Sequence, residues 1–217
     1  MIGSEPLQRR AILYGLLARL HTYPLTEPPL AALSALRLDG ATEELRSALG
    51  QVQSAAISAG AAGMDAINVE ATRLFEGPGK PFAPPYASFY LHGRLMGPAA
   101  ISAGRFYIAQ GAMPDTKLPP DLLSLELAFM AHLATRAEQT AVEGEQDAAL
   151  GALAASLEFL DAHLLVWLPR FVEDVARAAN VEFFPRLGRF TLAILEWDRR
   201  WLKALLSEQM VIEGVQK

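Results

Sequence analysis

The residues that could do chemistry in this chain are few, and they form no known catalytic pattern. None of its histidines, His21, His92, His132 and His163, belongs to an H-E-x-x-H motif or has a glutamate three positions before it. A helical zinc or di-iron carboxylate site is therefore not indicated. Residues 77–80, Gly-Pro-Gly-Lys, lack the G-x-x-x-x-G-K-[ST] spacing of a phosphate-binding loop. The chain has no G-x-S-x-G nucleophile elbow and no cysteine, so we expect neither a catalytic residue nor a metal site.

Two polar residues interrupt apolar stretches of the sequence. Glu126 lies within the run Leu122–Met130, where a charge is costly unless it is paired or hydrogen-bonded. We favour a structural hydrogen bond to loop backbone, and a contact with a ligand is the alternative. His163 directly precedes Leu164 on an apolar stripe, which is typical of a histidine at the edge of the core that is bonded to a neighbour.

Aromatic residues gather around a proline-rich segment. Phe75, Phe82, Tyr86, Phe89 and Tyr90 occur close together, and four prolines lie among them. Aromatic rings supply apolar contact area, and tyrosine adds a polar tip, so this group is suited to line a binding groove. The same rings are equally suited to pin the loop to the core. The residues alone leave both interpretations open.

Composition narrows the classes of partner. The 217 residues include 19 Lys plus Arg and 24 Asp plus Glu, a net charge of −5. Nucleic acid is not expected as a partner, because binding to phosphates normally depends on a concentrated positive patch. A hydrophobic content of 52% predicts a buried core. No apolar run approaches the roughly 18 residues that suggest a membrane span, so we expect no stable membrane insertion and a cytoplasmic location.

Helical spacing dominates the elements that must position these residues. Helices are expected over 65–75, 88–96 and 99–110, and the clearest apolar stripe runs from Leu150 to Trp167. The tryptophans at 167, 197 and 201 fit core packing at helical intervals, and a cofactor-binding box is the alternative. No window alternates like a β-strand. We therefore predict an all-α fold, a single globular domain over residues 1–217 with about eight to ten helices.

Several local signals predict where these helices begin and end. Ser4 is expected to cap the first helix. Asp121 is expected to cap the helix that begins directly after Asp121. The Ala/Gly/Ser stretch 54–63 is expected to be a frayed end or connector. Pro169 either kinks a helix or begins a new one. Two irregular segments are expected, a proline-rich loop at 77–86 and a second loop at 111–120.

Three sequence blocks resemble a known family. Residues 70–78 (EATRLFEGP) and 84–90 (PPYASFY) are similar to the E-x-x-x-L-F-x-G-P … P-P-[YW]-x-S-x-[YW] signature of the TorD/DmsD/NarJ molybdoenzyme maturation chaperones. Residues 118–121 (LPPD) with 125–130 (LELAFM) are similar to the family's P-[PE]-D-H … E-L-x-F-M block. Residues 159–169 (FLDAHLLVWLP) are similar to its F-x-x-x-H-L-x-x-W-x-P block. The blocks occur in the family's order.

The resemblance implies a TorD-like fold and a cytoplasmic, non-catalytic chaperone. Such proteins bind the N-terminal leader, often a twin-arginine signal, and the apo catalytic subunit of a molybdopterin-dependent oxidoreductase until its cofactor is inserted. A leader with a basic start and an apolar stretch needs an apolar groove with an acidic rim. The family implies no resident cofactor, only weak contact with molybdopterin guanine dinucleotide or a guanine nucleotide, which no phosphate motif here supports. The protein would be a monomer or homodimer.

The resemblance also implies roles for individual residues. The rings of Tyr86, Tyr90 and Trp167 would form the apolar wall of the groove. Asp121, helped by Glu126 and His163, would order the loop or meet the polar end of the leader. The residues expected to contact the client are thus Tyr86, Tyr90, Asp121, Glu126, His163 and Trp167. The residues expected to maintain the motif, with Ser88 capping the helix it begins, are Glu70, Leu74, Phe75, Gly77, Pro78, Pro85, Ser88 and Pro120.

The chain departs from the family pattern in places, and two other functions stay open. Leu122 stands where many members have a histidine, so no role of that histidine is carried over. Ala71 and Gly79 replace frequent aromatic residues. The alternatives are a small helical metal- or cofactor-dependent enzyme and an adaptor subunit of a redox complex. The client enzyme cannot be identified from these residues.

Overall fold

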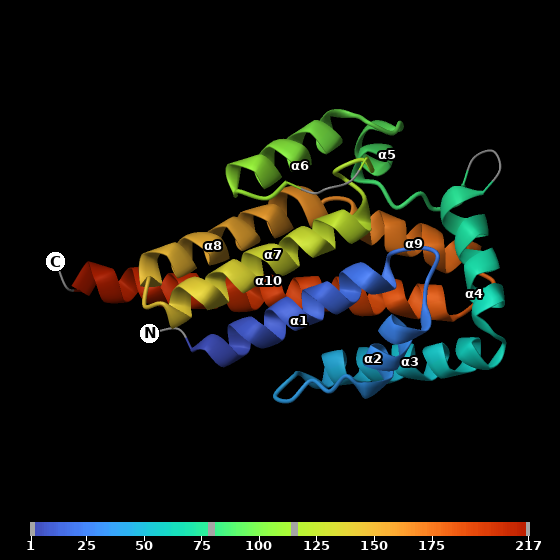
Figure 1. Cartoon of the computed structure of the whole chain (residues 1–217), viewed down its shortest axis with the longest axis horizontal. Helices are drawn as coiled ribbons and strands as arrows, with labels where there is room; N and C mark the ends of the chain where they lie inside the picture. The colour runs from blue at the N-terminus through green and yellow to red at the C-terminus, as the bar shows by residue number, and fades with distance from the viewer. Residues whose placement is uncertain (1–2, 78–80, 114–116, 216–217) are drawn as a thin grey trace.

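The computed structural model describes residues 3–77, 81–113 and 117–215, with side chains up to residue 209. The secondary structure in these ranges is helical (Figure 1). The expected all-α fold is confirmed, and one isolated antiparallel bridge, between Tyr86 and Leu122, is the β-type pairing found in these ranges. The elements are α1 (Ser4–Leu20), α2 (Glu27–Ala35), α3 (Glu43–Ala61), α4 (Met64–Ala71), π-helical η1 (Thr72–Glu76), α5 (Ala87–His92), α6 (Pro98–Ala109), α7 (Leu123–Val142), α8 (Gln146–Phe159), π-helical η2 (Leu160–Leu164), α9 (Leu168–Ala178) and α10 (Phe183–Val215).

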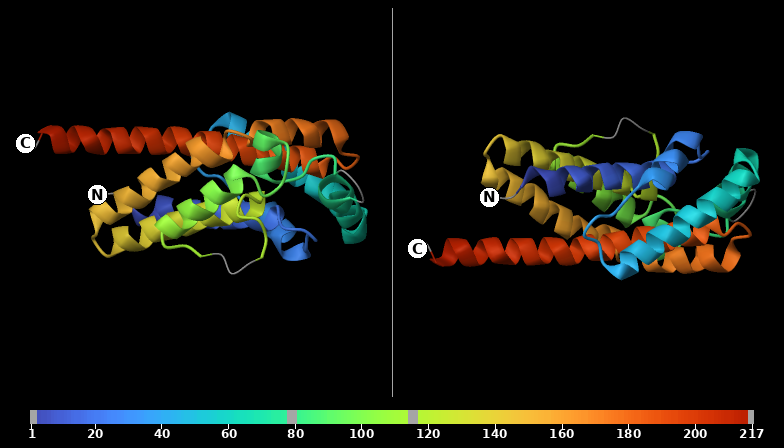
Figure 2. Two further views of the ribbon diagram at one scale, coloured as in Figure 1. Left: turned by 90° about the horizontal axis from the view of Figure 1, so that it is seen from above. Right: turned by 90° about the horizontal axis from the view of Figure 1, so that it is seen from below.

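The helices stack in layers around one core. The most extensive pairings join α1 to α7, α7 to α8 and α10 to α3. The α5–α6 hairpin covers one side of this bundle, and α2 and α3 cover the opposite side (Figure 1). The C-terminal part of α10 extends past the other helices, as both views of Figure 2 show.

The apolar spacing of α1 explains its place in the core. Leu13, Leu16, Leu17 and Leu20 are buried on one face of this helix, as the three- and four-residue intervals predict. The predicted cap at Ser4 is wrong. The capping position is occupied by Gly3, and no side chain accepts a hydrogen bond there.

Two helix boundaries differ from the sequence prediction. The stretch 54–63 is not a connector, because α3 continues to Ala61 and buries Ala56 and Ala59. Alanine favours helix strongly, and its small side chain suits close packing. The helix expected over 88–96 ends at His92, because Gly93 adopts a left-handed conformation with φ 70° that terminates α5.

Pro169 begins a new helix, which decides between the two alternatives of the sequence. The predicted stripe follows α8 and η2, and the chain then turns before α9 starts at Leu168 with the proline in its first turn. Within the described ranges, no individual helix has the length and apolar character to cross a membrane, although residues 146–164 and 168–178 pass that test together as a pair bent by 50°.

Candidate functional site

The first two sequence blocks meet in space along a short backbone contact. The segment ending the first block runs antiparallel to the segment before α7, and the Tyr86–Leu122 bridge joins them. The Leu123 N–H donates to the Pro85 carbonyl at 2.9 Å, and the Ala87 N–H donates to the Asp121 carbonyl at 3.1 Å. Segments more than 30 residues apart in the chain therefore form one unit.

Asp121 is completely buried at this junction, where it caps a helix other than the one predicted. Its Oδ2 atom accepts a hydrogen bond from the Ser88 N–H at 2.7 Å, in the first turn of α5. The first turn of a helix has unsatisfied N–H groups and a positive dipole end, so a carboxylate is stabilised there. Two sequence predictions are wrong on this point. Leu122 occupies the capping position of α7 and Tyr86 that of α5, and the Ser88 hydroxyl has no hydrogen-bond partner within residues 3–77, 81–113 and 117–209.

Glu126 joins the second and third sequence blocks. The Trp167 indole Nε1–H donates to Glu126 Oε2 at 3.1 Å, and both side chains are fully buried. The predicted structural hydrogen bond is present, but its partner is an indole and not loop backbone. Burial raises the pKa of Glu126 well above its usual value, and the nearby charge of Asp121 adds to this, while the bond from Trp167 acts in the opposite direction.

Tyr90 and Trp167 lie beneath the surface and do not line an open groove. Their rings stack with centroids 5.5 Å apart, and their exposed fractions are 7% and 0%. The Arg170 guanidinium donates to the Tyr90 carbonyl at 3.1 Å and so ties α9 to α5. Of the three rings predicted to form the apolar wall, Tyr86 is half-buried and so reaches solvent. A peptide contact with Tyr90 or Trp167 stays a prediction that requires the residues around these rings to rearrange.

His163 belongs to a neighbouring group of rings. It is buried and stacks on Phe159 with centroids 4.5 Å apart, and Phe106 approaches its edge at 5.5 Å. Burial lowers the pKa of His163, which favours the neutral imidazole. Its position at the edge of the core agrees with the sequence interpretation.

Glu70 links the first block to the segment between α9 and α10. It accepts hydrogen bonds from the Arg73 guanidinium at 2.7 and 2.8 Å and from the Asn180 N–H at 2.6 Å. Burial raises the pKa of Glu70, but these hydrogen bonds outweigh burial and lower it overall. The Arg73 guanidinium also contacts the Ala178 carbonyl and lies 4.8 Å from the centroid of the exposed Phe82 ring.

The other residues expected to maintain the motif pack or bond the loop. Phe75 stacks on Tyr23 with centroids 4.7 Å apart, and the buried Leu74 accepts the Ala83 N–H at its carbonyl. A Cβ atom at Gly77 would lie 3.2 Å from the Arg73 carbonyl oxygen, which favours glycine. Pro85 is buried, and the Pro120 carbonyl accepts the Tyr107 hydroxyl at 2.7 Å. Pro78 lies outside the described residues.

Four buried polar atoms around this junction have no hydrogen-bond partner among the described residues. They are Ser88 Oγ, Tyr90 OH, Asp121 Oδ1 and Glu126 Oε1. Most buried polar atoms in proteins are paired, because an unpaired one costs about 1–3 kcal/mol. Two of the four are carboxyl oxygens, so the junction suits a hydrogen-bond donor or a cation. No group of three metal-ligating side chains is found in the described ranges.

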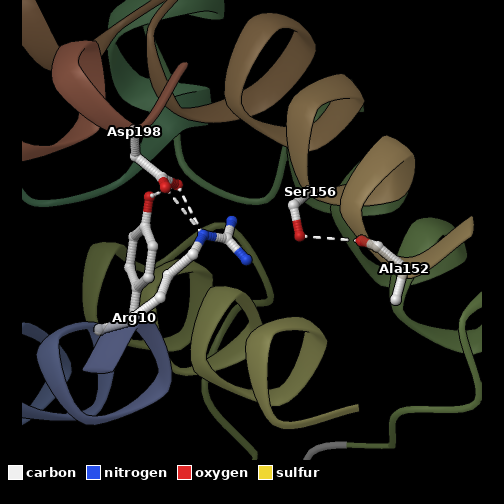
Figure 3. Close-up of polar contacts among 5 residues, drawn as sticks. Arg10, Ala152, Ser156 and Asp198 are labelled. Carbon is white, nitrogen blue, oxygen red and sulfur yellow. Dashed lines mark hydrogen bonds and ion pairs between the residues drawn. The ribbon is translucent and has the colours of Figure 1, made fainter. Parts of the chain in front are cut away.

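A cavity of about 510 Å³ lies away from the sequence blocks, between α1, the segment joining α2 to α3, and α10. Trp197 and Trp201, which the sequence analysis assigned to core packing, are only partly buried and line it. Behind them, Arg10 Nε donates to both oxygens of Asp198 at 2.8 and 3.0 Å (Figure 3). The Tyr14 hydroxyl also donates to Asp198, at 2.7 Å. Sequence reasoning missed this buried ion pair.

The comparisons with known proteins agree with the sequence blocks. The fold and the contacts described above define a helical-bundle protein in which the three sequence blocks come together. The sequence model of the family described as nitrate reductase delta subunit matches residues 38–173, and the chain belongs to this family. The resemblance inferred from the sequence blocks is confirmed.

Individual relatives point the same way. The chain is 35% identical over 127 residues to the chaperone protein TorD of Vibrio cholerae serotype O1 (strain O395), covering 57% of this chain and 56% of that protein. It is 29% identical over 142 residues to the chaperone protein TorD of Aliivibrio salmonicida, covering 63% and 64%. The matched region thus spans less than two thirds of the length of these relatives.

One solved structure is similar over most of its length. It is a crystal structure of a protein proposed to be a redox enzyme maturation protein, from Archaeoglobus fulgidus. The TM-score is 0.49 at 20% sequence identity, and the alignment covers 89% of this chain and 93% of the other.

Proposed function

We propose that this protein is a non-catalytic chaperone for the catalytic subunit of a molybdopterin-dependent oxidoreductase. It would bind the N-terminal leader and the apo form of that subunit, assist insertion of the cofactor, and hold back export or assembly until then. Membership of the family and the similarity to proteins named as chaperones support this function. The observation that carries the site assignment is the pair of buried carboxyl groups, Asp121 and Glu126, each with one oxygen that has no hydrogen-bond partner in the part of the chain that the structure describes.

The chemistry of this pair suits a cationic peptide. A guanidinium group presents five N–H donors in a planar fork, which matches carboxyl oxygens. The twin arginines of a leader would supply such donors. Asp121 Oδ1 would accept them directly, and Glu126, whose pKa is raised by burial, would release its proton to solvent when a guanidinium docks beside Oε1. The energetic cost of leaving these oxygens unpaired would be relieved on binding, so the client itself would complete the network.

The rings would hold the apolar part of the leader. Tyr86 is half-exposed at the end of the proline-rich loop, and Tyr90, four residues further along the chain, stacks on Trp167. Among the described residues of the expected loop, Ala83 is held by one backbone hydrogen bond to Leu74, and Pro85 by one to Leu123. A peptide that displaced this segment would reach all three rings. His163, neutral at the inner end, would order the neighbouring helix.

Calorimetric titration with a synthetic twin-arginine leader peptide tests this function. We expect Tyr86→Ala and Asp121→Ala to weaken binding clearly, with helicity unchanged by circular dichroism. Glu126→Gln removes the acid but keeps an oxygen for Trp167, so it should lose affinity without losing stability. A peptide with both arginines replaced by glutamine should bind weakly to the unchanged chain. Unchanged affinity in both Tyr86→Ala and Asp121→Ala would refute these site assignments.

The cavity beside α10 provides a matched control. Trp201→Ala alters a large ring that lies outside the sequence blocks. We expect this variant to bind the leader like the unchanged chain. If Trp201→Ala abolished binding and Tyr86→Ala did not, the leader would dock in the cavity and not at the junction of the blocks.

Co-purification separates a chaperone from an adaptor subunit or an enzyme. We expect the protein to accompany the immature apo subunit from the cytoplasm, as a monomer or homodimer, and to be absent from the mature oxidoreductase. Retention in the finished complex would favour the adaptor alternative. A stoichiometric metal or cofactor in the purified protein would favour the enzyme alternative.

A further inference from the structure

The α5–α6 hairpin carries a surface that the proposed function does not use. From residue 77 to residue 114 the sequence has no Asp or Glu, but it has Lys80, Arg94 and Arg105. The rest of the chain has 16 basic and 24 acidic residues, so a basic stretch lies within an acidic protein. Such a local reversal of charge indicates an anionic partner.

Exposed apolar side chains are concentrated in the same stretch. Seven of the thirteen large apolar residues that are exposed in the described ranges lie between residues 82 and 113, and they are Phe82, Leu91, Leu95, Met96, Ile101, Ile108 and Met113. Single exposed apolar residues are common on protein surfaces, but a concentration of this kind marks an interaction site.

The geometry of α6 separates a buried face from an outer face. Ala100, Ala103 and Tyr107 are buried against the bundle. Ile101 and Ile108, with exposed fractions of 57% and 64%, lie on the outer part of the helix with the exposed Arg105 between them. Spacings of four and three residues place these three side chains on one stripe.

The carboxylates near the hairpin belong to other elements. Asp121 and Glu126 are fully buried, Glu76 ends η1 before the hairpin, and Asp174 pairs with Arg177 on α9. The outer side therefore presents basic and apolar groups together. A basic leader would be repelled by this side, which distinguishes it from the proposed leader site.

We propose that the outer face of the α5–α6 hairpin docks the protein on the surface of an anionic lipid bilayer. The hairpin lies on the outside of the bundle (Figure 1), and neither of the two cavities described in the protein is lined by it. A protein partner normally seats its anchors in pockets, whereas a bilayer accepts apolar side chains from a convex surface. The basic residues would interact with anionic headgroups, and the aliphatic residues would enter the boundary of the acyl chains. This inference does not depend on leader binding.

Flotation of the full chain with lipid vesicles tests this proposal. We expect binding to vesicles of phosphatidylcholine mixed with phosphatidylglycerol, weaker binding at high salt, and little binding to phosphatidylcholine alone. Replacing both arginines, Arg94→Gln with Arg105→Gln, should raise the lipid concentration needed for half-maximal binding by roughly 30-fold, because each basic residue near the surface contributes about 1 kcal/mol. Ile101→Ser with Ile108→Ser should also weaken binding.

Matched variants on other faces serve as controls. Ile57→Ser changes an exposed isoleucine of α3, and Arg19→Gln changes an exposed arginine of α1. Both should bind vesicles like the unchanged chain. Equal binding to neutral and anionic vesicles, or normal binding by both hairpin variants with helicity retained, would overturn the proposal. If the hairpin variants lost the client and no vesicle binding occurred, the surface would belong to an acidic protein partner.

Discussion

The Asp121 carboxylate accepts the Ser88 N–H at 2.7 Å, so a residue just before α7 caps α5. The two residues are 33 positions apart, and the loops on either side meet at this bond. Fixing the first turn of α5 also fixes the direction of the Tyr86 and Tyr90 side chains, which lie on either side of Ser88 in the chain. The bond therefore connects the stability of the junction with the position of its rings.

Asp121→Ala should lower the free energy of unfolding by about 1–3 kcal/mol, because it removes a helix cap and leaves the Ser88 N–H buried without a partner. Asp121→Asn keeps an oxygen acceptor at the same place and should cost less. Urea denaturation followed by circular dichroism measures both values. Equal losses for the two variants would show that charge, and not the hydrogen bond, is what matters there.

Trp167→Phe should destabilise the protein by roughly 1–3 kcal/mol, because it removes the indole N–H and leaves the fully buried Glu126 without the donor that Trp167 supplies. The stacking partner of Tyr90 is retained in this variant. A double-mutant cycle with Glu126→Leu, which removes the acceptor that glutamine would keep, isolates the energy of the pair. A coupling energy near zero would contradict a specific Trp167–Glu126 interaction.

The sequence predicted that Glu126 needs a partner but not which one. Its position in an apolar run reveals the cost of burying it, whereas Trp167 is 41 residues away and no local pattern connects them. Asp121 was assigned to the wrong helix for a similar reason, since capping signals in a sequence point to the next helix and not to one packed beside it. Helices, by contrast, follow from apolar periodicity, and so the fold class could be predicted.

Burial raises the pKa of Glu126, so the folded protein holds a proton there that the unfolded chain releases above a pH of about 4.5. The stability due to this proton is fully present below that pH and is lost as the pH rises through the raised pKa. Glu126→Gln has no such proton, and its free energy of unfolding should fall less with rising pH. Denaturation midpoints of the two proteins, measured from about pH 5 upward, test this difference, because this range lies above the pKa of a glutamate in an unfolded chain.

His21 should make the free energy of unfolding depend on pH in the opposite direction to Glu126. It is buried with Nε2 3.0 Å from Thr191 Oγ1, and burial lowers the pKa of His21 from 6.5 to about 3. Between these two values the unfolded chain binds a proton that the folded protein excludes, so stability falls as the pH drops, by up to about 1.4 kcal/mol per pH unit. His21→Gln should flatten this slope.

Arg10 and Asp198, which are 188 positions apart in the chain, form a buried ion pair between α1 and α10 (Figure 3). Asp198 also accepts the Tyr14 hydroxyl, whereas Arg10 Nη1 and Nη2 have no partner among the described residues. Asp198→Ala would leave a guanidinium buried without its counter-charge, and it should cost about 3–5 kcal/mol. Adding Arg10→Met to Asp198→Ala removes that charge and should recover most of the loss, because an apolar pair avoids the desolvation of two ions. Thermal unfolding of the two variants measures this recovery, and a double variant no more stable than Asp198→Ala would mean that packing, and not the unpaired charge, sets the cost.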